Sequence, residues 1–398
     1  SGVCWYQPAG KMSETFDIAI LGGGCAGLSL ARELTNLSYQ KRVIIIEPRI
    51  IYEHDRTWCF WAETRHSLSE IVSKKWQRWR FSIQNRIVEH TGGGLSYQQI
   101  RSTDFYQACL ETIATSPNIE LRQGLFAKNV SIIGDWILIE TDKGPIAADR
   151  VIDTRPRPPH EDTALLWQIF SGAEVETDAS CFDPLSAGLM ENMKSDPTGL
   201  KFTYVLPTTT HRALIQTTRF ALTKIPPERL DDEFDADLNA LVQGPVTLKR
   251  WERGCLPMGQ TRIYANTSSR IIPAGQAGGV LRASSGYGFL RIQAWARALA
   301  EELVEGGTPR AKPFGSPLER NMDSIFLAAL LRSPHAAARW FIGLAEYMTG
   351  DEFGQFMSQS PSLNSWLKVV FALPKVEFLQ ALFLGRLQID RKCHRVTK

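Results

Sequence analysis

The sequence predicts an α/β protein with a parallel-sheet unit at its N-terminus, an inserted β-sheet domain and a helical C-terminal region. Three observations support this fold class. Two apolar runs within 16–47 are joined by a glycine-rich turn and a helical segment, strand-like runs dominate 160–260, and beyond about Arg310 apolar residues recur every three to four positions. Alternating or uniformly apolar short runs indicate strands, whereas the three-to-four spacing indicates amphipathic helices.

The N-terminal unit has the order strand, glycine turn, helix, strand and acid. Gly22 permits a tight turn, Gly24 lets the backbone approach a pyrophosphate, and Gly27 lets the following helix pack closely on the strand. Glu47 ends the second apolar run, about 20 residues past Gly27, and is placed to accept hydrogen bonds from a ribose. The complete arrangement predicts a Rossmann-type dinucleotide site rather than a purely structural turn.

Local signals predict the elements that follow this unit. A helix is expected over 103–114, since Pro117 disfavours helical backbone at the residue before it. Gly134-Asp135 separates two apolar runs and predicts a hairpin over 130–140. Further strands are expected at 150–153, 165–170, 201–206, 212–217 and 270–275, and a further helix at about 289–304.

Composition narrows the class of protein. With 398 residues, 43% hydrophobic and 22% charged, the chain suits two intimately packed globular domains. A net charge of +3 does not indicate nucleic-acid binding; it fits an anionic membrane surface or simply a solvated, mildly basic one. No stretch of ~18 uninterrupted apolar residues is present, so no membrane-spanning helix is expected. The seven cysteines lack C-x-x-C and metal-ligand spacing, which predicts reduced thiols and no metal site.

A second glycine-rich loop, at 275–279, indicates which dinucleotide is bound. A nicotinamide dinucleotide rarely requires a second glycine loop so far from the first, whereas the ribityl chain and isoalloxazine of a flavin extend past the pyrophosphate to another strand end. Gly275, Gly278 and Gly279 are therefore candidates to bind FAD through backbone N–H groups. The alternative is a flexible loop without a ligand.

These assignments divide the chain into four parts. Residues 1–12, up to Met12, are interpreted as a pre-start segment outside the fold. Residues 13–158 and 250–305 are predicted to form a discontinuous FAD-binding domain, 159–249 a β-sheet substrate domain, and 306–398 a helical C-terminal region.

Several segments together resemble one protein family. They are 21–28, 55–61 (Asp-Arg-Thr-Trp-Cys-Phe-Trp), 151–153, 182–184, 202–207, 212–215, 256–257, 277–287 with its Ser-Ser-Gly-Tyr, 322–326 and 371–374. These segments are similar to the lycopene cyclase family of flavoproteins, whose members have the p-hydroxybenzoate hydroxylase-like fold with an FAD domain of the glutathione reductase type. The resemblance covers nearly the whole chain from about residue 15.

The resemblance implies an unusual flavoenzyme. Members of this family catalyse the acid-initiated cyclisation of the end group of a linear polyene in carotenoid biosynthesis, an isomerase-type reaction without net redox change. The resemblance implies that reduced FAD stabilises the carbocation and that NAD(P)H reduces the flavin. Physically, a cation in a low-dielectric cavity gains from a nearby anion and from aromatic faces, and water must be excluded.

One position departs from the family's pattern. The family's acid is a glutamate in the strand that matches 212–217, where this chain has Gln216. An amide cannot supply a proton. Three interpretations stay open: another carboxyl such as Glu191 or Asp183 takes over, the reaction differs, or the cyclase activity is reduced or lost. A purely structural role for Glu191 is an equal alternative.

Charged side chains near the predicted strand ends resemble flavin contacts of this fold. Asp153 ends a strand and is expected to hold backbone or cofactor hydroxyls. Arg56 and Arg101 resemble residues that contact the flavin, although surface ion pairs explain them equally well. His54 and His211 lie in predicted loops and are expected to face solvent.

Aromatic residues are candidates to line a substrate cavity, with ordinary core packing as the alternative. They are Trp58, Phe60, Trp61, Phe202, Tyr204 and Tyr287.

The apolar stretch 366–385 is a candidate membrane contact. Lysines and Pro374 interrupt it too often for it to cross a bilayer. An interfacial helix that admits a lipid-soluble polyene is one interpretation, and a helix that covers the core is the other. The protein is expected in the cytoplasm, and under the first of these two interpretations it also contacts the inner face of the membrane peripherally.

A flavin monooxygenase or epoxidase of the same fold, acting on an apolar or aromatic substrate, is the main alternative function. Such enzymes usually carry Gly-Asp where Gly275-Gln276 stands here, and they consume oxygen and reductant at each turnover. A halogenase is disfavoured because no Trp-x-Trp-x-Ile-Pro segment is present. A catalytically altered homologue stays open because of Gln216.

Overall fold

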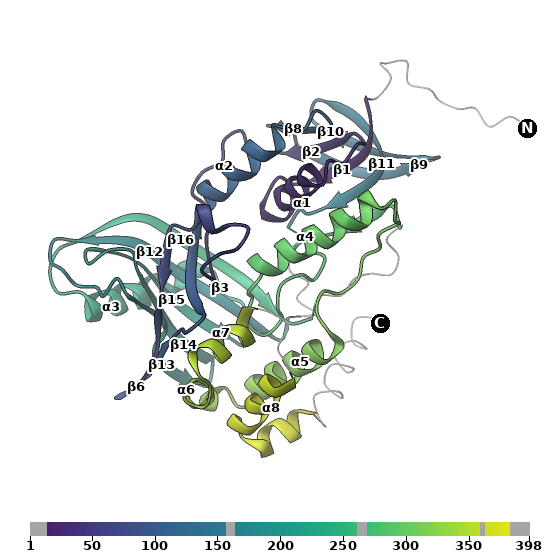
Figure 1. Ribbon diagram of the computed structural model, residues 1–398. Coiled ribbons are helices and arrows are strands. Elements are labelled where there is room, and N and C mark those ends of the chain that lie inside the picture. Colours follow the sequence, from purple (N-terminus) through teal and green to yellow (C-terminus); the bar gives the residue numbers. More distant parts are fainter. Residues whose placement is uncertain (1–13, 157–163, 261–268, 359–362, 383–398) are drawn as a thin grey trace, which may run out of the picture.

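A computed structural model describes residues 14–156, 164–260, 269–358 and 363–382. Two large sheets, one small sheet and the helices packed against them make up these residues. Figure 1 shows the first sheet with α1, α2 and α4 at the top, the second sheet at the lower left, and α5 to α8 at the bottom. The pre-start segment predicted at 1–12 lies outside the described residues.

The first sheet is the dinucleotide-type sheet that the sequence predicts. Its strand order is β8 (Ile119–Gln123), β2 (Val43–Glu47), β1 (Glu14–Leu21), β11 (Gly144–Asp153), β10 (Trp136–Thr141) and β9 (Ala127–Ile133), and β17 (Ile271–Pro273) pairs with β11. The strands from β8 to β11 and β17 run parallel, and β9 and β10 form the predicted hairpin. All five β2 residues are buried, as expected for a strand covered on both faces.

Three helices pack beside this sheet. They are α1 (Cys25–Asn36), α2 (Ser102–Ile113) and α4 (Phe289–Val304). Their apolar faces share one core cluster with β1 and β2. The predicted helices 103–114 and 289–304 are thereby confirmed to within a residue.

The second sheet forms the floor of the two cavities described in the next subsection. Its order is β16 (Val246–Met258), β12 (Leu166–Thr177), β15 (Arg212–Ala221), β14 (Gly199–Pro207), β13 (Ser186–Asp196), β5 (Arg78–Ile83) and β6 (Arg86–Thr91). The helix α3 (Asp231–Leu241) lies on its outer face (Figure 1).

This sheet differs from the domain limits drawn on the sequence. Strands β5 and β6 come from 78–91, and β16 runs through the expected boundary at 249/250. The sheet is therefore not a single insertion at 159–249. Pairing of β13 with β5 recruits a hairpin that lies more than a hundred residues earlier in the chain, and no local pattern records such a pairing.

A small third sheet connects the two halves. It consists of β3 (Thr57–Glu63), β7 (Leu95–Arg101) and β4 (Lys74–Trp76), and β7 continues directly into α2.

The C-terminal helices cover the open face of the second sheet. They are α5 (Pro317–Arg332), α6 (Ala337–Tyr347), α7 (Gly350–Ser358) and α8 (Leu363–Ala372), and 375–382 is also helical. Pro317 at the first position and a Ser316 hydroxyl that accepts from the Glu319 N–H define the start of α5. Short 3-10 turns occupy Ser69–Ile71, Pro227–Leu230 and Pro334–Ala336. Among the described residues, no helix is long and apolar enough to cross a bilayer.

Candidate functional site

The glycine turn after β1 has the geometry that the spacing predicts. Gly22 adopts φ +95°, which side chains rarely tolerate, and a Cβ at Gly27 would lie 2.0 Å from the Gly22 carbonyl oxygen. Gly24 is the N-cap of α1 and provides no side-chain cap. The first-turn N–H groups of α1 therefore point to where an anion would lie.

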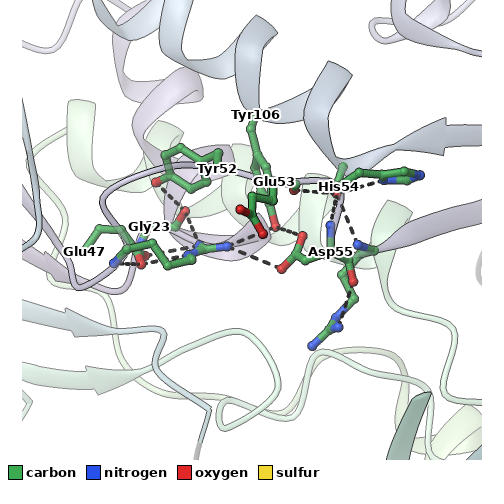
Figure 2. Close-up of polar contacts among 10 residues, drawn as sticks. Gly23, Glu47, Tyr52, Glu53, His54, Asp55 and Tyr106 are labelled. Carbon is green, nitrogen blue, oxygen red and sulfur yellow. Dashed lines mark hydrogen bonds and ion pairs between the residues drawn. The ribbon is translucent and has the colours of Figure 1, made fainter. Parts of the chain in front are cut away.

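Glu47 lies beside this turn in a cluster of polar contacts (Figure 2). One carboxylate oxygen accepts from the Gly23 N–H at 2.6 Å, and the other accepts from the backbone N–H and Nε of Arg49, each at 2.8 Å. The Arg49 guanidinium also stacks against the rings of Tyr52 and Tyr106. Glu47 is placed next to the turn as expected, with protein donors already on both oxygens, and its role toward a ribose stays a prediction.

The second glycine loop adjoins the first. A Cβ at Gly275 would lie 3.1 Å from the Ala26 side chain in the first turn of α1. The N–H groups of Gly278 and Gly279 donate to carbonyls of their own loop. The backbone N–H groups of Gly275, Gln276 and Ala277 donate to no backbone carbonyl of the described residues. The first half of the loop therefore has N–H groups available for a ligand.

The charged candidates near the strand ends differ in their surroundings. Asp153 is buried at the end of β11 and accepts from Nε and Nη2 of Arg155, each at 2.9 Å. Arg56 donates to the Asp55 carbonyl and lines a cavity described below. Arg101 is exposed at the end of β7, without an ion pair among the described residues.

A cavity of about 420 Å³, here called the junction cavity, lies between the second glycine loop and the second sheet. Gln276, Gly286 and Phe289 line it from the first half of the molecule. Gln168, Gln216 and Glu252 line it from the second sheet. A ligand on the two glycine loops would therefore reach a cavity floored by β12, β15 and β16.

Gln216 and Glu252 form a polar pair in the junction cavity. Gln216 of β15 and Glu252 of β16 are the pairing partners of Gly172 on the two strands that flank β12. The Gln216 amide donates to Glu252 at 2.6 Å. Glu252 also accepts from the Thr57 hydroxyl at 2.6 Å and pairs with Arg250 at 2.7 Å. A Cβ at Gly172 would lie 2.5 Å from Gln216 Cγ, so the glycine makes room for this pair.

The network continues to a histidine that the sequence placed in solvent. Arg250 bridges Glu252 to Glu174, and His54 contacts Glu174 at 3.2 Å. The His54 hydrogen bond, followed by that of Arg250, lowers the pKa of Glu174 to about 2. The His54 side chain is only 11% exposed, so the expectation of a solvent-facing His54 is wrong, whereas His211 is exposed.

A second cavity of about 400 Å³, here called the apolar cavity, lies between the second sheet and the C-terminal helices. Its walls are almost entirely aromatic and aliphatic. They include Trp61, Phe81, Phe202, Phe220, Phe326 and Phe353. The charged groups among the described lining residues are Arg282, Asp323 and Lys375.

The two cavities share a wall made by Tyr204, Ser285 and Tyr287. The Tyr287 hydroxyl lies 3.2 Å from the Tyr97 hydroxyl. Burial raises the pKa of Tyr204 to about 12 and that of Tyr287 further. Both tyrosines are therefore neutral at physiological pH, and side chains separate the two cavities.

The predicted aromatic residues divide between cavity and core. Trp61 and Phe202 line the apolar cavity, Tyr204 and Tyr287 line both cavities, and Trp58 lines the junction cavity. Phe60 lines neither, because it is 2% exposed and stacks on Phe289 in the core of the first half. Strand alternation separates Phe60 from Trp61, since β3 presents successive side chains to opposite faces, whereas Trp58 shares the face of Phe60 and also stacks on Phe289.

The two carboxyls proposed to replace the family's acid line neither cavity. Glu191 is buried between strands, where it accepts from the Ser82 hydroxyl at 2.5 Å and pairs with Arg80. Asp183 forms a surface ion pair with Arg78 at 2.7 Å. The structure therefore places neither carboxyl at a cavity wall. The pairing of β13 with β14 is irregular on both sides of Glu191, which breaks the alternation with Leu189 of the apolar cavity, and Asp183 lies before that strand.

Sequence reasoning missed three charged groups at the site. Glu252 precedes the Leu256-Pro257 pair, Asp323 lies within 322–326, and Arg49 follows the second strand. A signal existed for Asp323, which is the one charged residue of the mostly apolar run 321–331. Among the described residues, no cluster of three or more His, Cys, Asp or Glu could hold a metal.

Comparison with known proteins gives one family and one fold. The family described as lycopene cyclase protein matches residues 17–382. A geranylgeranyl bacteriochlorophyll reductase-like protein from Thermoplasma acidophilum superposes with a TM-score of 0.59 at 13% identity, covering 95% of this chain and 99% of that one. No curated protein matches the sequence.

Two further structures share the fold. The p-nitrophenol 4-monooxygenase PnpA from Pseudomonas putida DLL-E4 gives a TM-score of 0.57 at 15% identity, over 94% of this chain and 98% of that one. The halogenase PltM in complex with phloroglucinol and FAD gives 0.54 at 13% identity, over 85% and 78%. At such identities the likeness concerns the fold alone.

Proposed function

The chain belongs to the lycopene cyclase protein family, and from this we propose that it is an FAD-dependent enzyme that cyclises the end group of a linear polyene or related terpenoid without net redox change. The observation that carries the proposal is the wall of Tyr204, Ser285 and Tyr287, which separates an apolar cavity from the cavity beside the glycine loops. An apolar chain and a flavin ring would meet there.

FAD fits the residues of the first half of the molecule. The close contact of Gly27 with the Gly22 carbonyl and the uncapped first turn of α1 form a cradle for a pyrophosphate. Gly22, Gly24 and the first half of the 275–279 loop would hold it, and Arg56 and Gln276 line the cavity that the isoalloxazine would enter. When bound and reduced, FAD would supply a fixed negative charge near the reacting carbons.

The walls of the apolar cavity would protect a carbocation. Trp61, Phe202 and Phe220 present aromatic rings, whose faces attract cations. The absence of water from such a cavity would prevent hydration of the cation. The chain's own residues would thus bind the polyene, orient its end toward the shared wall and exclude water.

The C-terminal helices are proposed to dock on a membrane surface from which the substrate is taken. Leu363, Phe371 and Val376 are 72%, 60% and 64% exposed, beside Lys375, which lies over the Phe371 ring, and Lys368, which pairs with Glu352. The same stretch lines the apolar cavity through Val370, Phe378 and Leu382. An apolar outer face with flanking lysines suits an anionic bilayer interface, and the inner face would receive the polyene.

Anaerobic incubation with lycopene and chemically reduced FAD tests the proposal. Cyclised product is expected with reduced FAD and not with oxidised FAD, and NADPH is expected to support activity only as the initial reductant. Consumption of one NADPH and one oxygen per product would favour a monooxygenase or epoxidase of this fold instead. No product with any reduced flavin would contradict the cyclase assignment.

A further inference from the structure

A cyclisation started by acid needs a proton donor that reaches the polyene. Gln216 cannot donate a proton, and Glu191 and Asp183 line neither cavity. Glu252 lines the junction cavity, but both of its oxygens accept hydrogen bonds from neighbouring side chains. Among the described residues that line the apolar cavity, the single carboxyl belongs to Asp323.

One carboxylate oxygen of Asp323 has hydrogen-bond partners, and the other has none among the described residues. It projects from α5 and is 4% exposed. Its Oδ1 accepts from the Ser284 hydroxyl at 2.8 Å and forms a buried ion pair with Arg282, whose Nε lies 3.4 Å away. No hydrogen bond to Oδ2 is found within the described part of the chain, so this oxygen is available to carry a proton.

The neighbouring charges leave the acid form accessible. Burial raises the pKa of Asp323 above its usual value, and Glu319, one turn earlier on α5, adds to the rise, while Arg282 and Ser284 oppose it. Arg282 also donates to the Phe356 carbonyl and stacks on that ring. Arg291 from α4 pairs with Glu319 rather than with Asp323.

A small polar cavity offers a route for protons to Asp323. Its volume is about 20 Å³, and Gln260, Glu319, Arg320 and Asp323 line it. A space of this size holds about one water, and its polar lining suits one. Glu319 Oε2 is buried without a partner among the described residues, which such a water would satisfy. Asp323 thus borders a polar space on one side and the apolar cavity on the other.

We propose that Asp323 is the general acid that protonates the polyene in the apolar cavity. This inference rests on the proposed function. The O–H bond of Asp323 breaks as a C–H bond forms at the terminal double bond, which leaves a carboxylate and a tertiary cation. Ring closure forms a C–C bond, and loss of a proton from the neighbouring ring carbon to the Asp323 carboxylate restores both the double bond and the acid. No electrons are gained or lost.

Infrared spectroscopy of the full chain tests the acid without any substrate. Carbon-13 labelling of aspartate carboxyls is expected to reveal a protonated aspartic acid at pH 7 that is absent in Asp323→Asn. The other buried aspartate of the described residues, Asp153, is held by Arg155. A spectrum in which every aspartate is ionised at pH 7 would overturn the proposal.

Anaerobic conversion of lycopene provides the second readout. Asp323→Asn is expected to lower the rate by about 10²–10⁴-fold, with flavin and lycopene binding retained, and Asp323→Glu to recover part of it. Glu191→Gln serves as the control, because Glu191 lines neither cavity. The rate is expected to fall as the pH rises through the pKa of Asp323.

The outcomes separate this inference from the proposed function. Wild-type cyclisation with an equally active Asp323→Asn would reject Asp323 and keep the cyclase. If the wild type forms no product, the cyclase assignment fails, and the infrared result still decides whether Asp323 is a protonated acid. If Asp323→Asn does not fold, the infrared spectrum of the labelled wild type and the activity of Asp323→Glu still decide whether Asp323 is the acid.

Discussion

Gln216 and Glu252 show how an amide beside a carboxylate sets the chemistry of the junction cavity. They come from β15 and β16, yet both face Gly172 of the strand between them. The Gln216 amide donates to Glu252, where a glutamate at the same place would present a second carboxyl. A pair of carboxyls shares a proton, whereas an amide and a carboxylate do not.

Gln216→Glu is therefore expected to bind a proton near neutral pH. Two carboxyls at the 2.6 Å separation of the present pair cannot both ionise. Because the pKa of the pair is raised in the folded state, the free energy of unfolding should decrease as the pH rises above the ordinary glutamate pKa. Urea unfolding between pH 5 and 8 measures this. The double variant Gln216→Glu/Glu252→Gln restores one carboxyl and one amide, so its stability should depend on pH as that of the wild type does. If its unfolding free energy falls with pH as steeply as that of Gln216→Glu, this account is contradicted.

Gly27 and Gly24 form a matched pair for testing the cofactor cradle. In Gly27→Ala the added Cβ would overlap the Gly22 carbonyl, with an expected cost of about 1–3 kcal/mol in unfolding free energy and loss of FAD binding. In Gly24→Ala the nearest atom is 3.9 Å away, so stability should change little while FAD affinity still falls. Thermal unfolding and flavin fluorescence titration measure the two effects. Unchanged FAD affinity in Gly24→Ala would argue against a pyrophosphate at this turn.

At the scale of elements, α8 and the helical stretch 375–382 have two apolar faces. One face lines the apolar cavity, and the other is exposed beside lysines. A helix that only covered the core would present polar residues to water. The exposed face is therefore the element-scale feature that the proposed membrane contact explains.

Phe371→Glu is expected to weaken binding to anionic liposomes by about tenfold or more, since insertion of one large apolar side chain contributes about 1.5–3 kcal/mol. Flotation with vesicles of mixed neutral and anionic lipids measures the bound fraction. Ile133→Glu is the control, because Ile133 is 57% exposed on the β9–β10 hairpin, away from these helices. An equal loss in both variants would remove the special role of the C-terminal helices.

At the scale of the whole molecule, His90 ties the helical region to the second sheet. It lies on β6 and is 6% exposed. Its Nδ1 accepts from the Trp79 indole N–H at 3.1 Å, which leaves Nε2 to donate to the Ala345 carbonyl of α6 at 2.7 Å. The fold therefore uses the neutral imidazole at this contact.

The folded protein is expected to lose stability as the pH falls below about 6.5, the ordinary histidine pKa. Burial lowers the pKa of His90, so in that range the unfolded chain binds a proton that the folded chain excludes. Urea unfolding at pH 7.5, 6.5 and 5.5 measures the slope. His90→Asn should be less stable at neutral pH but less sensitive to this change; the same slope in both proteins would show that another group is responsible.

The FAD-type half could be predicted closely from sequence because its signals are local. The glycine spacing, the two apolar runs and the helices 103–114 and 289–304 follow from properties of adjacent residues, and the structure has them within a residue or so. Tyr204 and Tyr287, which were candidates for a cavity lining, lie in the wall between the two cavities. The placement of Glu191 and Phe60 failed, because strand register and side-chain direction depend on partners far away in the chain.

The sequence by itself determined the family and the dinucleotide-type sheet, since both follow from the type and spacing of residues along the chain. Only the tertiary structure decided which carboxyls face a cavity. Asp323 from α5, the loop at 282–287 and strands from the second sheet meet across long sequence separations, and burial between them gives the carboxyl its apolar surroundings. The chemistry of this carboxyl depends on its neighbours in space, and tertiary packing rather than sequence order brings those neighbours to it.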